Sequence, residues 1–261
     1  MYKVIFSDLD GTLLSDDKKI CDRNIEAIKA ANEKGTKLVV CTGRLPFCYE
    51  MYGSELDLSE GVSTNGQVVY SKGKLIKAKY LPKDVARTVI NYGITHNEYE
   101  RVFGLNFLYL LNSEKGGSDV NFYKQSASVN HNEILKLVED IDIYKLGFFA
   151  DREHLIDIRK DIEAMNLDAD TVFSGPRLLE VVVKGETKAK GVIDYCKYNN
   201  IDINETIGAG DEENDAEMLK TVGLACCPNN ASEYVKGICD YATEKNNNEG
   251  CIAEIIEKYV K

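Results

Sequence analysis

Short apolar segments at both ends of the chain constrain its fold more strongly than any other feature. Val4–Ser7 and Lys37–Cys41 read as buried strands, and a helical pattern lies between them. The same alternation returns after residue 188, where a helical segment precedes an apolar run over residues 206–210. Strands that alternate with helices form parallel sheets with helices on both faces. The sequence therefore predicts an α/β fold whose core is a Rossmann-like, doubly wound parallel sheet.

The stretch between these two halves has a different character. Residues 83–184 are rich in Tyr, Asn and Lys and mix short strands with helices. We expect them to form a smaller α/β domain inserted into the core, which would comprise residues 1–82 and 185–261. Pro82 and Gly185 mark breaks in regular structure, so we expect the hinges there.

Two smaller elements are expected after the second strand. A helix should follow Arg44, because Pro46 suits the first turn of a helix. Residues 62–70 read as a hairpin that turns on Asn65-Gly66, since Asn-Gly favours a tight two-residue turn.

The composition limits the partners and the compartment of the chain. Its 261 residues carry a net charge of −11, whereas nucleic acids and anionic membranes bind basic surfaces. No stretch approaches the roughly 20 apolar residues of a membrane helix, and no secretory signal is present. The eight cysteines include no Cys-x-x-Cys pair, and the three histidines are isolated. We therefore expect a cytoplasmic protein with reduced thiols, no zinc site, and no nucleic-acid or membrane partner.

Asp8 and Asp10 lie two residues apart where the first predicted strand ends. The period of an extended chain places both side chains on one side, and open parallel sheets carry their sites beyond the C-terminal ends of their strands. One carboxylate there could attack phosphorus while the other exchanges protons with the leaving and entering oxygens. Carboxylates are also ligands that Mg²⁺ prefers. The alternative is that residues 10–12, Asp-Gly-Thr, are only a turn.

Three further residues could contact a phosphate group. Thr42 and Gly43 follow the second strand, where a hydroxyl and an amide could donate to phosphate oxygens. Lys188 begins a helix and could balance phosphate charge beside the aspartates. Each feature alone is also typical of an ordinary loop or of a surface lysine.

Residues 208–215, Gly-Ala-Gly-Asp-Glu-Glu-Asn-Asp, form the second informative segment. A predicted strand leads there into a glycine turn, an acidic cluster and a helix. Acidic residues suit a helix N-terminus, but one cap requires only one of them. The surplus of acids favours a metal site.

Together these segments resemble the four ordered motifs of the haloacid dehalogenase superfamily. Thr42 and Lys188 are 146 residues apart, and an insertion between the second and third motifs implies the larger, C2-type α/β cap in this superfamily. The subgroup that the chain resembles is the Cof-type phosphatases of subfamily IIB, to which the segments 63–66, 230–231 and 248–250 are also similar. The four motifs are residues 6–14 (Phe-Ser-Asp-Leu-Asp-Gly-Thr-Leu-Leu), 41–44 (Cys-Thr-Gly-Arg), Lys188 and 210–215 (Gly-Asp-Glu-Glu-Asn-Asp).

The resemblance implies a role for each residue. Asp8 would be the nucleophile and a Mg²⁺ ligand, while Asp10 would give its backbone carbonyl to the metal and act as general acid and base. Repulsion from Asp8 is expected to raise the pKa of Asp10. Asp211 would ligate Mg²⁺, and Asp215 would orient Lys188 or a metal-bound water. The transferring phosphoryl would be held by the amide of Leu9 and by Thr42, Gly43, Lys188 and Asn214.

The implied function is Mg²⁺-dependent hydrolysis of a small phosphorylated metabolite, such as a sugar phosphate, through an aspartyl-phosphate. The cap would close over the site and select the leaving group. A phosphomutase of the same fold and a non-catalytic sensor of phosphorylated metabolites stay open as alternatives. A dehalogenase would lack the second aspartate of the first motif, and a P-type pump would need membrane helices. The chain departs from the family at Glu212, where glycine is frequent, and at Cys226-Cys227.

Overall fold

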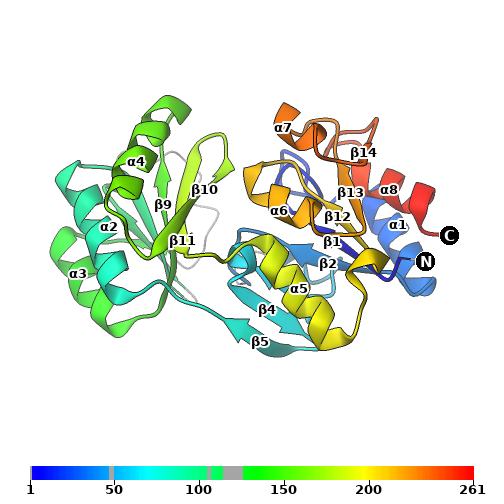
Figure 1. Ribbon diagram of the computed structural model, residues 1–261, viewed down its shortest axis with the longest axis horizontal. Coiled ribbons are helices and arrows are strands. Elements are labelled where there is room, and N and C mark those ends of the chain that lie inside the picture. Colours follow the sequence, from blue (N-terminus) through cyan, green and yellow to red (C-terminus); the bar gives the residue numbers. More distant parts are fainter. Residues whose placement is uncertain (1, 47–49, 105–106, 114–125) are drawn as a thin grey trace. The chain divides into compact units, whose positions relative to one another are not determined.

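The computed structural model describes residues 2–46, 50–104, 107–113 and 126–261 (Figure 1). The chain divides into two compact units. We call Met1–Ala78 with Thr187–Lys261 the core unit, and Lys79–Glu186 the inserted unit. None of the helices in the described ranges is long and apolar enough to cross a membrane.

A sheet of eight described strands forms the centre of the core unit. In chain order they are β1 (Val4–Ser7), β2 (Lys37–Cys41), β3 (Gly61–Ser63), β4 (Val68–Ser71), β5 (Lys74–Ala78), β12 (Thr206–Ala209), β13 (Leu224–Cys227) and β14 (Tyr241–Ala242). Their order in the sheet is β14-β13-β12-β1-β2-β3-β4-β5, and the strands from β14 to β3 run parallel. The six parallel strands therefore have the order 3-2-1-4-5-6 of a doubly wound fold, which confirms the predicted core.

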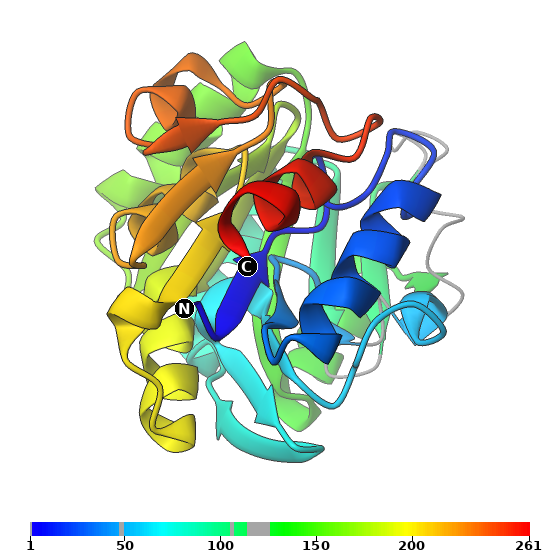
Figure 2. The ribbon, with the colours of Figure 1, turned by 90° about the vertical axis from the view of Figure 1, so that its right-hand side faces the viewer.

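Helices cover both faces of this sheet. α1 (Asp22–Glu33) and α8 (Cys251–Tyr259) lie side by side on one face (Figure 2), while α5 (Lys188–Asn199) packs on the other. Ile5 of β1 lies in the hydrophobic cluster of α1 and α8, whereas Phe6 contacts the ring of Tyr195 on α5 at 5.4 Å between centroids. This alternation explains why Val4, Ile5 and Phe6 of β1 are all apolar, since a strand buried on both faces exposes no side chain. Two short helices, α6 (Ala216–Leu219) and α7 (Glu233–Lys236), complete the unit.

One predicted element differs from the structure, and another lies partly outside the described residues. The helix expected after Arg44 falls partly on residues 47–49, which lie outside the described residues, and Glu50–Tyr52 is a 3-10 helix. The predicted hairpin is present as β3 and β4. However, Ser63 pairs with Val68, so four residues form the loop instead of the expected Asn-Gly pair.

The central strand β1 lies between β2 and β12, where the chain crosses from one half of the sheet to the other. Ser7 pairs with Ala209, and the backbone N–H of Asp8 donates to the carbonyl of Ala209 at 2.9 Å. The residues that follow β1 and β12 therefore leave the sheet side by side. Open α/β sheets bind their ligands at this switch point.

The inserted unit is a second α/β sheet of six described strands in the order β10-β11-β9-β6-β7-β8. Its strands are β6 (Glu100–Gly104), β7 (Leu108–Leu111), β8 (Ser126–Ser128), β9 (Ile143–Phe149), β10 (Ala169–Gly175) and β11 (Leu178–Val183). Its helices are α2 (Lys83–Thr95), α3 (His131–Asp140) and α4 (Arg152–Ala164). The helices pack against one face of the sheet through Val102, Leu146, Phe148 and Val181.

Glu100 is fully buried on the helix-covered face of this sheet. Neither of its carboxyl oxygens has a hydrogen-bond partner among the described residues. A Cβ atom on Gly93 would lie 2.3 Å from its Oε2, so α2 passes directly over the carboxyl group. Burial raises the pKa of Glu100 well above its ordinary value.

This shift predicts a pH-dependent stability. The folded chain keeps the Glu100 carboxyl protonated at pH values where the unfolded chain has released the proton. The contribution of Glu100 to the free energy of unfolding is therefore fully present below the pKa of this group in the unfolded chain, which is near 4.5. Above that pH the free energy of unfolding should fall by up to about 1.4 kcal/mol per pH unit, until the folded pKa is passed. Glu100→Gln cannot ionise, so it should become more stable than the parent as the pH rises.

Urea unfolding between pH 5 and pH 8 would measure this difference. Glu153→Gln, at an exposed position on α4, is the matched control and should follow the parent protein. If Glu100→Gln and the parent lost stability in parallel across this pH range, the carboxyl would not be held neutral.

Candidate active site

Lys188 joins two aspartates in the buried interior of the core unit. Its Nζ donates to Asp8 Oδ1 at 2.7 Å and to Asp215 Oδ1 at 2.5 Å, and its side chain is fully buried. The side chain of Thr187 accepts from the backbone of Lys190, which caps α5 and places Lys188 at its first position. Burial lowers the pKa of Lys188, but Asp215 and Asp8 outweigh it and raise the pKa above its ordinary value. The lysine is therefore a fixed positive charge.

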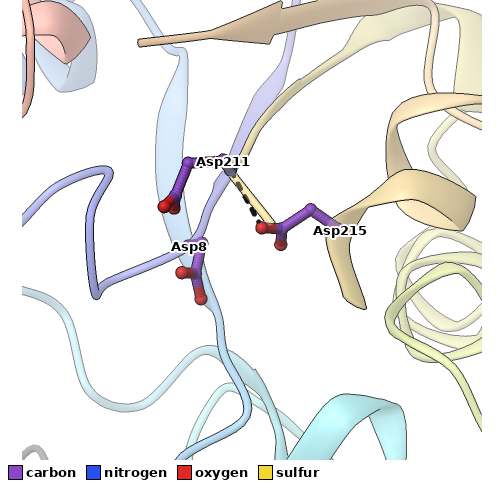
Figure 3. A group of neighbouring side chains, drawn as sticks. All are labelled: Asp8, Asp211 and Asp215. Carbon is purple, nitrogen blue, oxygen red and sulfur yellow. Dashed lines mark hydrogen bonds between the residues drawn. The ribbon is translucent and has the colours of Figure 1, made fainter. Parts of the chain in front are cut away.

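Three carboxylates converge at the switch point of the sheet. Asp8 follows β1, and Asp211 and Asp215 follow β12 (Figure 3). One oxygen of each lies within 4.8 Å of the others. Burial raises the pKa values of Asp8 and Asp211, and the neighbouring carboxylates add to it, although Lys188 opposes the rise at Asp8. Buried carboxylates this close repel one another, so a divalent cation with oxygen ligands fits the cluster.

The three carboxylates are not equivalent. Asp215 uses Oδ1 to accept from Lys188 and Oδ2 to accept from the backbone N–H groups of Asp211 and Glu212, at 3.0 and 3.1 Å. Its hydrogen bonds thus hold the turn and the lysine. Asp211 is oriented by Thr12, whose Oγ1 donates to Oδ1 at 2.7 Å. Asp8 and Asp211 are therefore the side chains best placed to ligate a metal.

The departure at Glu212 has a local explanation. The Glu212 side chain accepts from the backbone N–H at Asp215, while Asp215 accepts from the backbone of Glu212. This reciprocal capping begins the 3-10 helix Glu213–Asp215. A glutamate in this position therefore also supports the turn that carries Asp211.

Two glycines allow the acidic residues to approach. A Cβ on Gly11, whose φ is +79°, would lie 2.2 Å from Asp211 Oδ2. A Cβ on Gly210 would lie 2.3 Å from Asp215 Cγ. Because larger residues cannot occupy these places without moving the carboxylates, the glycines are part of the site.

Asp10 differs from its predicted environment. Arg44 donates to both of its carboxylate oxygens at 2.6 Å, and Lys18 Nζ donates to Oδ1 at 2.7 Å. Burial alone would raise the pKa of Asp10, but these two cations outweigh it and hold the pKa below its ordinary value. The expected rise in pKa is therefore wrong. β1 ends at Ser7, so the alternation of an extended chain no longer applies, and the two aspartates have different partners.

Apart from Lys188 on α5, the predicted phosphate-binding residues follow three strands, β1, β2 and β12. Thr42 is buried after β2, and its Oγ1 accepts from the backbone N–H of Arg44 at 3.2 Å. A Cβ on Gly43 would lie 3.1 Å from Asn65 Oδ1 and 3.6 Å from Asn214 Nδ2. Asn65 Oδ1 in turn accepts from Asn214 at 3.0 Å. The structure thus brings Gly43 and Asn214 together. Leu9, which lies between Asp8 and Asp10 in the sequence, buries its side chain in the hydrophobic core.

Several residues support the site although no role could be assigned to them from the sequence. Asn65, Asn230 and Asn248 lie in segments that only resemble the subgroup, and no pattern singles out Lys18 or Asn247. The three tail asparagines hold the loop that follows β1. Asn230 donates to the carbonyl of Gly11, Asn247 donates to the carbonyl of Leu14, and Asn248 accepts from the backbone of Asp16.

Comparison with known proteins identifies the family of this chain. The family model of the haloacid dehalogenase-like hydrolases matches residues 5–256. The 5-amino-6-(5-phospho-D-ribitylamino)uracil phosphatase YcsE of Bacillus subtilis is 28% identical over 264 residues, which cover 99% of this chain and 96% of that protein. The chloroplastic endoribonuclease YBEY of Arabidopsis thaliana is 28% identical over 99% of this chain, but the match spans only 46% of that longer protein.

Solved structures place the fold in the same group. The structure of a sugar phosphatase of subclass IIB of the superfamily is 21% identical, has a TM-score of 0.85 and matches over 98% of both chains. This likeness confirms the predicted fold, and the family model confirms the predicted superfamily. The chain belongs to the haloacid dehalogenase-like hydrolase family.

Proposed function

We propose that this chain hydrolyses small phosphomonoesters with Mg²⁺, through a phosphoryl group carried on Asp8. The observation that supports the proposal most directly is the position of the Asp8 carboxylate. It lies at the end of the central strand, with one oxygen held by Lys188 and with Asp211 close by. A nucleophilic carboxylate requires a fixed orientation and a nearby positive charge, and this arrangement supplies both.

The residues of the chain account for the two steps. An Asp8 oxygen attacks phosphorus, the bond to the leaving oxygen breaks, and Asp10 gives a proton to that oxygen. Water then attacks the phosphorus of the aspartyl-phosphate while Asp10 takes a proton from the water, which restores Asp8 and releases phosphate. Both oxygens of Asp10 accept hydrogen bonds in this structure. Arg44 and Lys18 therefore oppose protonation of Asp10, and loosening of either contact would favour it.

The acidic cluster would hold the metal through the side chains of Asp8 and Asp211 and the backbone carbonyl of Asp10. Bound Mg²⁺ supplies positive charge to the phosphate oxygens and orients them for attack. Lys188, Thr42, Gly43, Asn214 and the amide of Leu9 would bind the same phosphoryl group. Asp215 would act through Lys188 and the backbone turn.

An assay of phosphate release tests the proposal. Multiple turnover of p-nitrophenyl phosphate that depends on Mg²⁺ is expected of a phosphatase, while a sensor would bind phosphate esters without releasing phosphate. Incubation with glucose 1-phosphate distinguishes a phosphatase from a phosphomutase, because a phosphomutase would yield glucose 6-phosphate. A panel of sugar phosphates, together with the ribitylaminouracil phosphate that gives the Bacillus relative its name, would then rank the substrates.

We expect Asp211→Ala to lose activity mainly through weaker metal binding. The variant lacks one carboxylate ligand but keeps Asp8, so raised Mg²⁺ should restore part of the turnover. The Mg²⁺ concentration for half-maximal activity should rise by at least about tenfold. Glu217→Ala removes an exposed carboxylate of α6 and should leave this concentration unchanged. An equal loss of activity at every Mg²⁺ concentration, with unchanged metal affinity, would exclude Asp211 as a ligand.

A further inference from the structure

The loop between β3 and β4 contains three consecutive residues in the left-handed backbone region. Their φ angles are +53° at Thr64, +51° at Asn65 and +89° at Gly66. Glycine adopts such angles readily and asparagine tolerates them, but a β-branched threonine does so only with strain. The Thr64 side chain is also fully buried, and its hydroxyl has no hydrogen-bond partner among the described residues. Strain of this kind persists only where the surrounding structure imposes it, and it is frequent at functional sites.

Two backbone hydrogen bonds join this loop to the segment that follows β2. The N–H of Thr64 donates to the carbonyl of Arg44 at 3.0 Å, and the N–H of Asn65 donates to the carbonyl of Thr42 at 3.1 Å. Gly43 lies between these two acceptors in the sequence. The loop therefore fixes the backbone of a predicted phosphate-binding segment.

The same loop packs directly on the beginning of α5. A Cβ atom on Gly66 would lie 2.0 Å from the carbonyl oxygen of Thr187, and a Cβ atom on Gly191 would lie 2.8 Å from the Cα of Gly66. Lys188 is the first residue of this helix. The close packing thus ties the loop to the segment that carries the buried lysine.

The Asn65 side chain lies between two predicted ligands of the phosphoryl group. Its Oδ1 accepts from Asn214 Nδ2 at 3.0 Å, and a Cβ atom on Gly43 would lie 3.1 Å from the same oxygen. An amide nitrogen carries two N–H groups, so Asn214 has a second one that can donate to a phosphoryl oxygen. Without the acceptor on Asn65, the Asn214 amide could turn over and present its oxygen, which repels phosphate.

We propose that Asn65 is a positioning residue of the phosphatase reaction, which acts through Asn214. Its carbonyl oxygen fixes the orientation in which Asn214 donates to the transferring phosphoryl. The strained loop places this oxygen beside both Asn214 and Gly43. The inference rests on the proposed function, because it assigns the effect of Asn65 to a proposed phosphoryl ligand and gives Asn65 no role in metal binding.

Asn65→Gly tests this role with little change to the backbone, because glycine adopts a φ of +51° without strain. We expect kcat/KM for p-nitrophenyl phosphate to fall by about 10- to 100-fold, the range for loss of a group that orients a ligand-binding side chain. Calorimetry with Mg²⁺ and inorganic phosphate should show weaker phosphate binding. The Mg²⁺ concentration for half-maximal activity should not change, because Asp8 and Asp211 keep their partners.

Asn200→Gly is the matched control. Asn200 is exposed at the C-terminal end of α5 and has a φ of +54°, so the same substitution there removes a left-handed asparagine away from the site. This variant should keep the parent values of kcat/KM and phosphate affinity.

A double-mutant cycle separates action through Asn214 from a general structural role. Asn214→Ala should lower kcat/KM at least as much as Asn65→Gly does. If Asn65 acts through Asn214, the variant that carries both substitutions should be no less active than Asn214→Ala alone. Additive losses would overturn the inference, as would an unchanged kcat/KM in Asn65→Gly.

Stability and binding keep the two proposals distinguishable. If Asn65→Gly failed to fold, or melted far below Asn200→Gly and lost Mg²⁺ and phosphate affinity together, Asn65 would be structural and the inference would be overturned. A parent protein that does not turn over p-nitrophenyl phosphate would overturn the phosphatase proposal. Equal phosphate affinities of the parent and Asn65→Gly would overturn the role of Asn65 whether or not the parent turns over the ester.

Discussion

Asp8→Asn is expected to lower phosphate release by roughly 10⁴-fold or more while the protein stays folded. The amide has nearly the shape of the carboxylate but cannot attack phosphorus. The side chain lies in a buried cluster of like charges, so its neutralisation relieves repulsion and should not lower the melting temperature. Initial rates of multiple turnover with p-nitrophenyl phosphate would measure the loss.

The matched control for this variant is Asp17→Asn, an exposed aspartate nine residues along the chain. It should retain the parent rate. Mass spectrometry of the intact variant must exclude deamidation of the new asparagine, which would restore the nucleophile. Multiple turnover above about one hundredth of the parent rate in verified Asp8→Asn protein would remove Asp8 from its proposed role.

Lys188→Met should be the most destabilising single change in the site. The substitution leaves Asp8 and Asp215 buried without the ammonium group that contacts both. Loss of one partner from a buried ion pair lowers the free energy of unfolding by about 3–5 kcal/mol, which is a drop of roughly 10 °C in melting temperature for a unit of this size. Thermal unfolding in EDTA, where no cation can replace the lysine, would measure the effect.

Two further variants show whether charge causes this loss. Lys190→Met removes an exposed lysine from the same helical turn and should leave the melting temperature unchanged. Lys188→Met combined with Asp215→Asn should recover part of the lost stability, because one of the two unpaired carboxylates has become neutral. Equal melting temperatures for Lys188→Met and Lys190→Met would contradict the ion-pair account.

The parts of the fold that were predictable are those with a regular pattern. β1 and β2 have the bounds expected from their apolar runs, since a strand that is buried on both faces is continuously apolar in its interior. The meeting of Asp8 with Asp211 follows from the rule that sites lie at strand ends, which requires no knowledge of individual contacts.

The partners of polar side chains in loops were not predictable. Asn65 and Asn214 are 149 residues apart, and no periodicity connects them. Arg44 reaches Asp10 across 34 residues, and this contact reverses the pKa shift that the neighbouring aspartate alone suggested. Such contacts depend on where several loops end in space. They are visible only once the backbone is known.

The position of β1 in the sheet has a consequence for synthesis on the ribosome. One of its two neighbours is β12, so the first 78 residues cannot complete their sheet until the chain beyond residue 187 has emerged. The inserted unit is one continuous stretch and can close its own sheet earlier. We therefore expect the middle of this chain to become protease-resistant on stalled ribosomes before its beginning does, the reverse of the usual order. If the N-terminal segment resisted the protease before residue 206 had emerged from the ribosome, this order of folding would be contradicted.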